Sequence, residues 1–143
     1  MLRDPRELLS QGFFVPVPGL FVEGDRAYVA GYGRGLEVLD LSVPTEPRLG
    51  GRLDVPGYVY GVWKDGTRLC FSTYEGELYV ADASDPDAPR IEARHEIPGE
   101  LHDVVCRGDV AYVAAGTRGL AVVDLRDGSM GMIPVVRTPR QLG

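Results

Sequence analysis

The sequence predicts an all-β fold, and three observations lead to this prediction. A tetrapeptide of the Ala-Tyr-Val-Ala type occurs at Ala27–Ala30, Leu69–Ser72 and Ala111–Ala114, so it recurs about every 42 residues. Apolar residues gather in short runs bounded by turn residues, without the apolar periodicity of a helix. The 143 residues also include 19 glycines and 11 prolines, which is typical of many short strands joined by turns.

Each repeat has enough marker segments to place four strands. A second apolar segment recurs with the same spacing, at Leu36–Asp40, Leu78–Asp82 and Leu120–Asp124. A glycine that suits a tight hairpin precedes each tetrapeptide, at Gly24, Gly66 and Gly108. The predicted strands include an inner one at Val104–Cys106, then Val110–Ala114 and Leu120–Asp124, and an outer one at Arg90–Ile97. Four strands in about 42 residues is the length of a β-propeller blade. A β-sandwich, the main alternative, does not require so regular a period.

The predicted blades span about residues 18–55, 56–97 and 98–139 of a module that covers residues 13–143. Residues 1–12 are expected to form an N-terminal arm with a short helix, because Asp4 suits the N-cap, Pro5 the first turn and Glu7 the capping-box position. Phe13, Val15 and Val17 alternate ahead of a Pro-Gly pair, as outer strands do elsewhere in the chain. They predict an extra N-terminal edge strand, which either pairs with the last blade of another protomer or caps an edge.

The repeats resemble a known family. The matching residues of the first repeat are Gly24, Ala27 to Ala30, Gly35, Leu36, Val38, Asp40, Ser42, Pro44 and Pro47, and together they are similar to the LVIVD repeat of bacterial and archaeal proteins. The resemblance covers about residues 18–139. The second repeat departs at Cys70-Phe71-Ser72 and Glu77, and the third lacks the Ser-x-Pro-x-x-Pro segment. The resemblance implies a β-propeller fold of bacterial type and implies no particular activity.

Three blades are too few to close a ring, since propellers have four to eight. We therefore expect a homo-oligomer, with a homodimer of six blades as the simplest closure. Closure by more subunits or by a different chain is an alternative, and the chain could also be a piece of a longer propeller. The expected function is that of a non-enzymatic scaffold that binds a protein or a small ligand.

Composition and charge argue against several classes of partner. The formal net charge of -6 opposes binding to nucleic acid. No apolar segment approaches the length of a membrane span, so we expect no membrane partner and a cytoplasmic location. Cys70 and Cys106 lie in apolar runs without metal-ligand spacing, and we interpret both as buried thiols. No motif for a cofactor or a metal ion is present.

The candidate binding site lies in the loops at one end of the blades, near the mouth of the central channel. The connections from an outer strand to the next inner strand, and the turns between second and third strands, should meet there. The expected binding residues are Tyr32, Arg34, Tyr58, Tyr60, Tyr74, Glu75, Glu100, His102, Asp103, Thr117 and Arg118. Aromatic and charged groups that converge on a cavity are typical of ligand sites, although such loops can also be merely solvated.

An enzyme is the alternative function. A hydrolase or lyase could use His102 as a general base beside Asp103, with Glu100 as a further candidate. The pair occurs once per chain, because the equivalent positions hold Tyr60-Gly61 and Pro18-Gly19, so we favour a structural role. His95 aligns with Leu53 and is expected to pack in the interior.

The recurrent aspartates Asp40, Asp82 and Asp124 could suggest metal binding. Each ends a strand and precedes a turn, which indicates instead that its carboxylate accepts hydrogen bonds from nearby backbone amides. The segment around Asp82, Asp85 and Asp87 lacks the glycine and the final glutamate of a calcium loop. We therefore predict no metal site.

Overall fold

The computed structural model describes residues 17–134, which form three four-stranded antiparallel sheets and one short 3-10 helix, η1 (Gly116–Arg118). Blade 1 contains β1 (Gly19–Glu23), β2 (Arg26–Ala30), β3 (Leu36–Asp40) and β4 (Arg48–Leu53). Blade 2 contains β5 (Val59–Asp65), β6 (Arg68–Thr73), β7 (Glu77–Asp82) and β8 (Arg90–Glu96). Blade 3 contains β9 (Val104–Arg107), β10 (Val110–Ala114), β11 (Leu120–Asp124) and β12 (Met130–Ile133). The predicted all-β fold of four-stranded blades is confirmed.

The strands of each blade follow one another in sequence order, as in a meander. The first hairpin of every blade turns at a glycine with positive φ: 58° at Gly24, 61° at Gly66 and 59° at Gly108. A residue with a β-carbon would be strained in this conformation. The recurrence of glycine at the same point of each repeat therefore has a backbone cause.

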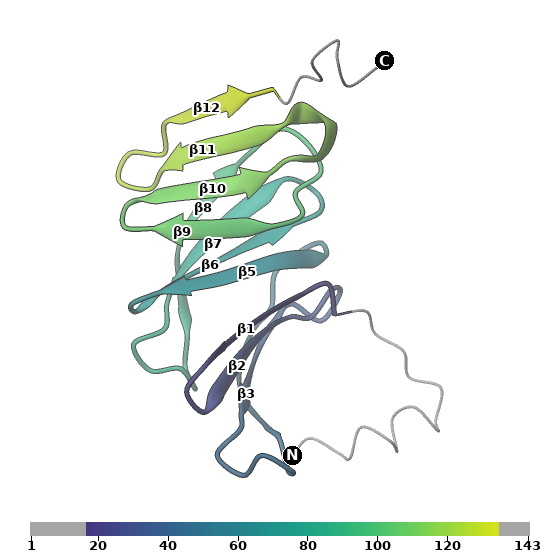
Figure 1. The fold of residues 1–143 in the computed structure, drawn as a ribbon, viewed down its shortest axis with the longest axis vertical. Helices are drawn as coiled ribbons and strands as arrows, with labels where there is room; N and C mark the ends of the chain where they lie inside the picture. Colours follow the sequence, from purple (N-terminus) through teal and green to yellow (C-terminus); the bar gives the residue numbers. More distant parts are fainter. Residues whose placement is uncertain (1–16, 135–143) are drawn as a thin grey trace, which may run out of the picture.

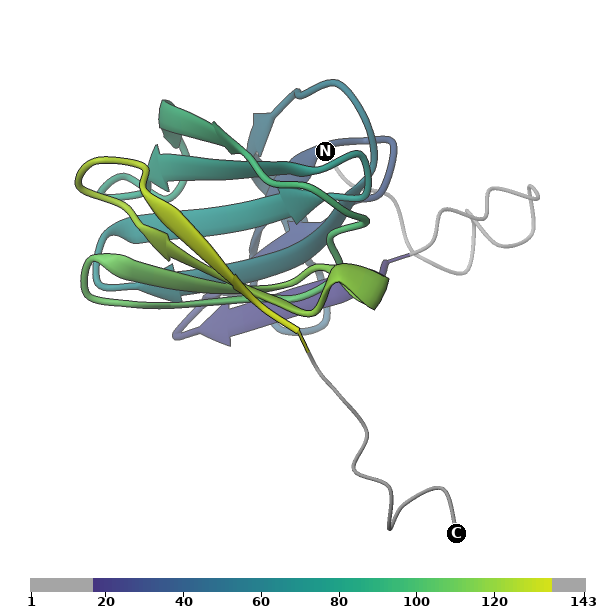
Figure 2. The same ribbon diagram turned by 90° about the horizontal axis from the view of Figure 1, so that it is seen from above.

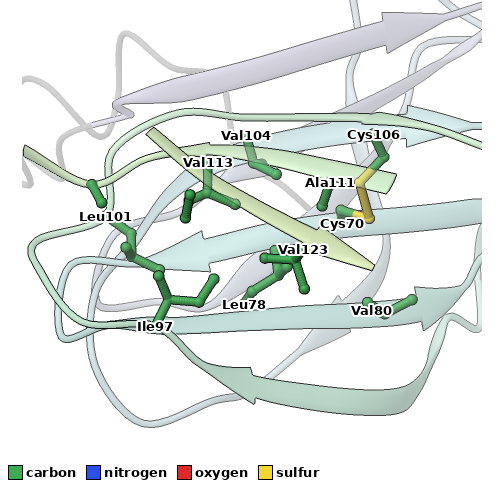
Figure 3. Packing of buried hydrophobic residues seen from close by; sticks show 12 residues of the cluster. Cys70, Leu78, Val80, Ile97, Leu101, Val104, Cys106, Ala111, Val113 and Val123 are labelled. Atoms are coloured by element: carbon green, nitrogen blue, oxygen red, sulfur yellow. A yellow bond between two sulfur atoms is a disulfide. The ribbon is translucent and has the colours of Figure 1, made fainter. Parts of the chain in front are cut away.

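The three sheets stack face to face, with their first strands side by side. β5 contacts both β1 and β9. The second, third and fourth strands of each blade lie at increasing distance from this row of first strands (Figures 1 and 2). One apolar core fills the space between blades 1 and 2, and includes Tyr28, Leu36, Val59, Leu69 and Phe71. A second core lies between blades 2 and 3, and includes Leu78, Leu101, Val104, Val113 and Val123 (Figure 3). This is the packing of neighbouring propeller blades.

Equivalent positions meet in the same way at both of these junctions. Tyr28 of blade 1 faces blade 2, where the ammonium nitrogen of Lys64 lies 5.7 Å from the centre of its ring. The residues one repeat later are Cys70 of blade 2 and Cys106 of blade 3, and these two are also in contact. We call Tyr28–Lys64 and Cys70–Cys106 the junction pairs.

The interpretation of Cys70 and Cys106 as buried thiols is wrong in one respect. Both residues are buried, but their sulfur atoms are joined in a disulfide (Figure 3). Their Cα atoms lie 6.8 Å apart, although the residues are 36 positions apart in the chain. The pairing arises because β6 and β9 belong to adjacent blades, and neither cysteine alone indicates this in the sequence.

The recurrent aspartates accept backbone hydrogen bonds, as expected. Asp40 accepts one from the amide of Ser42 at 2.8 Å, and Asp82 accepts one from the amide of Ser84 at 2.8 Å. These hydrogen bonds are the main cause that lowers the pKa of both carboxyls. At Asp124, hydrogen bonds from the side chain and the backbone amide of Arg126 lower the pKa to about 2.

The two sheets at the ends of the stack each carry exposed apolar side chains on the face that points away from blade 2. The face of blade 1 that points away from blade 2 carries Leu20 and Val22, which are 59% and 53% exposed. The face of blade 3 that points away from blade 2 carries Tyr112 and Ile133, which are 38% and 53% exposed. We call these the blade 1 end face and the blade 3 end face.

Some expectations concern parts of the chain that the structure does not describe. The N-terminal arm, its helix, and Phe13 and Val15 of the extra edge strand lie outside residues 17–134, as does the end of the third unit. His95 is partly buried, and its Nε2 atom has no hydrogen-bond partner among the described residues. No helix in residues 17–134 has the length and apolarity needed to cross a membrane.

Candidate functional site

The candidate residues come from loops that meet at one end of the blades. β1, β5 and β9 begin at this end, and the second strand of each blade ends there. Backbone hydrogen bonds connect the two kinds of loop. The amide of Tyr74 donates to the carbonyl of Tyr58 at 2.8 Å, and the amide of His102 donates to the carbonyl of Ala114 at 2.9 Å. The loop arrangement thus brings side chains from all three blades to the same end.

Four tyrosines and one histidine form a continuous cluster, which we call the aromatic cluster. The rings of Tyr32 and Tyr58 are stacked, with centroids 4.3 Å apart. Tyr60 occupies the middle, with its centroid 5.7 Å from that of Tyr32, 5.3 Å from that of Tyr74 and 5.6 Å from that of His102. The Tyr74 and His102 rings are perpendicular, 5.8 Å apart. Aromatic rings attract one another in such offset and edge-to-face arrangements, so these contacts stabilise the cluster.

The backbone around the cluster is closely packed, which fixes the ring positions. Tyr32 has a positive φ of 56°, an uncommon conformation for tyrosine, and pairs with Val59 of blade 2 as an isolated bridge. Gly61 lies against blade 3, so that a β-carbon there would be 2.5 Å from the carbonyl oxygen of His102. The buried hydroxyl of Ser72 donates a hydrogen bond to that same carbonyl at 3.3 Å.

Ser72 and Gly61 are positioning residues that the sequence analysis did not select. A signal for Ser72 exists in the sequence, since the equivalent positions of the other two blades are Ala30 and Ala114. A hydroxyl that appears in one repeat out of three indicates a local partner. Here that partner is the backbone of His102.

Two carboxylates adjoin the rings. Glu75 accepts a hydrogen bond from the amide of Tyr58 at 2.8 Å through its Oε1 atom. A hydrogen bond to Glu100, together with partial burial, raises the pKa of the Tyr74 hydroxyl. Burial is the main cause that raises the pKa of Tyr32, with the nearby Tyr60 and Tyr58 adding to it. The hydroxyls of Tyr32 and Tyr74 therefore stay protonated at physiological pH, beside two carboxylates.

Four other expected site residues make no ring contact with the aromatic cluster in the described residues. They are Arg34, Asp103, Thr117 and Arg118. Arg34 pairs with Glu37, with 3.0 Å between Nη2 and Oε2, so its charge is matched locally. Asp103 accepts a hydrogen bond from the amide of Val104 at 3.1 Å. Thr117 and Arg118 are exposed in η1, and the Arg118 side chain lies beside Gly99 rather than over a ring.

His102, the residue considered as a general base, belongs to the aromatic cluster. No hydrogen bond or ion pair joins the side chain of His102 to Asp103 or to Glu100 within the described residues. The imidazole instead makes edge contacts with Tyr60 and Tyr74. In residues 17–134 no group of three or more histidine, cysteine or acidic side chains could hold a metal ion.

Comparisons with known proteins bear on the repeats and the fold. A family model described as the LVIVD repeat matches residues 17–55 and 98–131, which make up about half of the chain. No curated protein matches the chain significantly.

Several solved structures are similar in fold. The computationally designed Ika8 protein has a TM-score of 0.63 and 10% identity, over 77% of this chain and 33% of that one. Glutaminyl cyclase of Myxococcus xanthus has a TM-score of 0.55 and 19% identity, over 77% of this chain and 48% of that one. The N-terminal domain of Nup159 has a TM-score of 0.58 and 18% identity, over 84% of this chain and 34% of that one.

At these identities the likeness concerns the fold, which is β-propeller-like. The chain spans less than half the length of each of these three structures.

Proposed function

Because the chain belongs to the LVIVD repeat family, we propose that it is a non-enzymatic scaffold in which two copies form one ring of six blades. A protein or a small ligand then binds at the aromatic cluster, at the mouth of the channel that the ring encloses. The observation that carries this proposal is the exposed apolar side chains on both end faces of a stack of three blades.

Equivalent residues inside the chain support this interpretation of the end faces. Tyr28, which corresponds to Tyr112, is 2% exposed because blade 2 covers it. Val62, which corresponds to Leu20, is 4% exposed because blade 1 covers it. The two end faces are therefore the same kinds of surface that already pack against each other within the chain. A second copy supplies both of the missing neighbours at once, and twofold symmetry closes the ring without leaving an open end.

The junction pairs predict which residues meet across the closing contact. One repeat after Cys70 comes Tyr112, and one repeat before Lys64 comes Val22. In the proposed ring, Tyr112 of each copy contacts Val22 of the other. Both positions are apolar and at least 38% exposed in the single chain, so this contact removes apolar surface from water.

The compartment stays a prediction. Disulfides persist in oxidising surroundings and are rare in cytosolic proteins. The Cys70–Cys106 bond therefore weighs against the expected cytoplasmic location.

Light scattering over a range of concentrations tests the assembly. We expect a mass of twice 15.5 kDa for the unaltered chain. Tyr112→Asp should give the mass of a single chain, because it places a carboxylate in both closing contacts. Val43→Asp serves as a matched control, since Val43 is 45% exposed in a loop outside the end faces and its replacement should leave the dimer intact. A single-chain mass for the unaltered protein at every concentration refutes self-closure and leaves completion by a different chain.

A further inference from the structure

The polar groups around the aromatic cluster include two glutamates that can accept hydrogen bonds from a ligand. The amide of Tyr58 is already bound to Glu75, and Glu100 lies close enough to the hydroxyl of Tyr74 to raise its pKa. The guanidinium of Arg34 is paired with Glu37. The Tyr58 amide and the Arg34 guanidinium are thus engaged within the protein, while the two glutamates keep unused lone pairs.

The charge at this end of the blades is negative. Glu75, Glu100 and Asp103 are exposed carboxylates. Of the nearby cations in the described residues, Arg34 is paired with Glu37 and Arg52 with Asp54, and Arg118 is exposed. The whole chain carries a formal net charge of -6. An anionic ligand would therefore be repelled, whereas a cation would be attracted.

The ring faces add a second source of attraction for a cation. Tyrosine rings carry negative potential on their faces and bind ammonium groups that lie within about 6 Å of the ring centre. Tyr58 is 43% exposed, and Tyr32, Tyr60 and Tyr74 are partly exposed. In the part of the chain that the structure describes, the cation–π contact found is that of Lys64 with Tyr28, so no lysine or arginine among these residues lies over the four rings.

We propose that the aromatic cluster, with Glu75 and Glu100, is a binding site for an organic cation that carries an alkylated ammonium group. This inference rests on the proposed ligand-binding function and specifies its chemistry. The rings of Tyr60 and Tyr74 contact the alkyl groups, and the carboxylates balance the charge. An alkylated ammonium fits better than a bare one, because it loses less hydration when it leaves water for a surface of ring faces and has few hydrogens to donate.

Isothermal titration calorimetry with choline tests the inference. Its neutral carbon isostere, dimethylbutanol, has the same shape without the charge and serves as the control ligand. We expect choline to bind and the isostere to bind at least about tenfold more weakly, which corresponds to about 1.4 kcal/mol for charge recognition. Equal affinities for the two compounds would show that the cluster is merely an apolar surface and would overturn the inference.

Substitutions identify the groups that act. Tyr60→Phe keeps the ring and should keep most of the affinity, whereas Tyr60→Leu should weaken choline binding about fivefold to thirtyfold, the range of one cation–π contact. Glu100→Gln should weaken binding several-fold, and more so at low salt. Glu46→Gln removes an exposed carboxylate from the loop between β3 and β4, outside the candidate site, and should have no effect. Equal losses from Glu100→Gln and Glu46→Gln would mean that only net charge matters.

The cation could belong to a small molecule or to a modified protein, and a second ligand distinguishes these sources. This ligand is a short peptide that contains one trimethyllysine, and its control is the same peptide with norleucine at that position. Tighter binding of the trimethyllysine peptide than of choline indicates a modified protein as the partner, and the reverse indicates a small molecule. The mass of each sample is measured at the same time. A dimer that binds neither cation refutes this inference and leaves the scaffold proposal standing. A protein that stays a single chain and binds choline supports the cation site and refutes ring closure.

Discussion

A pair of cysteines introduced at the proposed closing contact should link two copies of the chain covalently. The variant carries Val22→Cys and Tyr112→Cys, one residue on each end face. Cys70 and Cys106 occupy the equivalent positions at the junction of blades 2 and 3 and are joined by a disulfide. If the closing contact repeats the geometry of this internal junction, the new cysteines have the same relation to each other across two copies.

The native disulfide shows how far apart two cysteines can lie at such a junction and still form a bond. The Cα atoms of Cys70 and Cys106 are 6.8 Å apart, close to the limit of about 7 Å for bridging two cysteines. Two residues along a strand correspond to a shift of about 6.6 Å. A cysteine at Val110 instead of Tyr112 lies on the same face of β10 but two residues away, and should therefore fail to bond with a cysteine at Val22. The yield should change from nearly complete to negligible between the two variants.

The assay is electrophoresis in denaturant without reductant, after mild oxidation at a concentration where light scattering finds the dimer. We expect one species of twice 15.5 kDa for the Val22→Cys, Tyr112→Cys variant, which returns to the single-chain mass on reduction. Each single-cysteine variant should stay at the single-chain mass.

Two results would refute the reasoning. A ladder of higher multiples would mean that the end faces meet in an open array rather than in a twofold ring. Equal linking of the Tyr112→Cys and Val110→Cys variants with Val22→Cys would mean random collision, without the register that the repeats predict.

Three further predictions concern the chain itself. Reduction of the Cys70–Cys106 disulfide should lower the free energy of unfolding by roughly 4 kcal/mol, the entropy of a closed loop of this length, and a Cys70→Ala, Cys106→Ala variant should then unfold in urea at the same midpoint with or without reductant. Because the pKa of Asp124 is about 2 when folded and about 3.9 when unfolded, its stabilising effect should be present above pH 4 and disappear as the pH falls toward 2, so Asp124→Asn should flatten the unfolding free energy over that window. Gly61→Ala should cost about 1–3 kcal/mol, because the new methyl group meets the backbone of blade 3, whereas Gly131→Ala, which meets nothing within 4 Å, should be close to neutral in the same urea titration.

The blades could be predicted from the sequence because the repeat period carries the fold. The markers of the second and third strands align at fixed spacing, and the structure has β10 at Val110–Ala114 and β11 at Leu120–Asp124, the bounds that the third repeat predicts. The positive φ of Gly24, Gly66 and Gly108 follows from the same periodicity. At these positions the local preference of glycine for a turn and the repeat period predict the same structure. A prediction is dependable where local residue preferences and the overall pattern agree in this way.

The disulfide could not be predicted in this way, because it joins positions that are not equivalent in the repeat. Cys70 belongs to the second strand of its blade and faces forward, while Cys106 belongs to the first strand of the next blade and faces back. Their contact depends on how the sheets stack, which a period in sequence does not specify. Tyr28 and Lys64 occupy the equivalent positions at the junction of blades 1 and 2. Because a tyrosine and a lysine cannot form a disulfide, this pair gives no sign in the sequence that the two cysteines meet.

The sequence predicts which loops share an end of the blades, and this places the tyrosines together. It does not predict how the side chains pair. The structure stacks Tyr32 on Tyr58 and puts His102 against Tyr60 and Tyr74, away from a carboxylate partner. These details depend on close backbone approaches between blades, such as that of Gly61 to His102. The binding role of the site remains a prediction.

The position of the disulfide divides the molecule into unequal parts. The bond ties blade 2 to blade 3, while blade 1 is held to blade 2 by apolar packing and by ion pairs such as that of Arg26 with Asp87. In hydrogen exchange, the amides of blade 1 should therefore lose protection before those of blades 2 and 3, which open as one cooperative unit. In a ring of two copies, the opening of blade 1 frees the contacts on both of its sides. Subunits should then exchange between rings at the rate at which blade 1 opens, with the cross-linked pair of blades intact throughout.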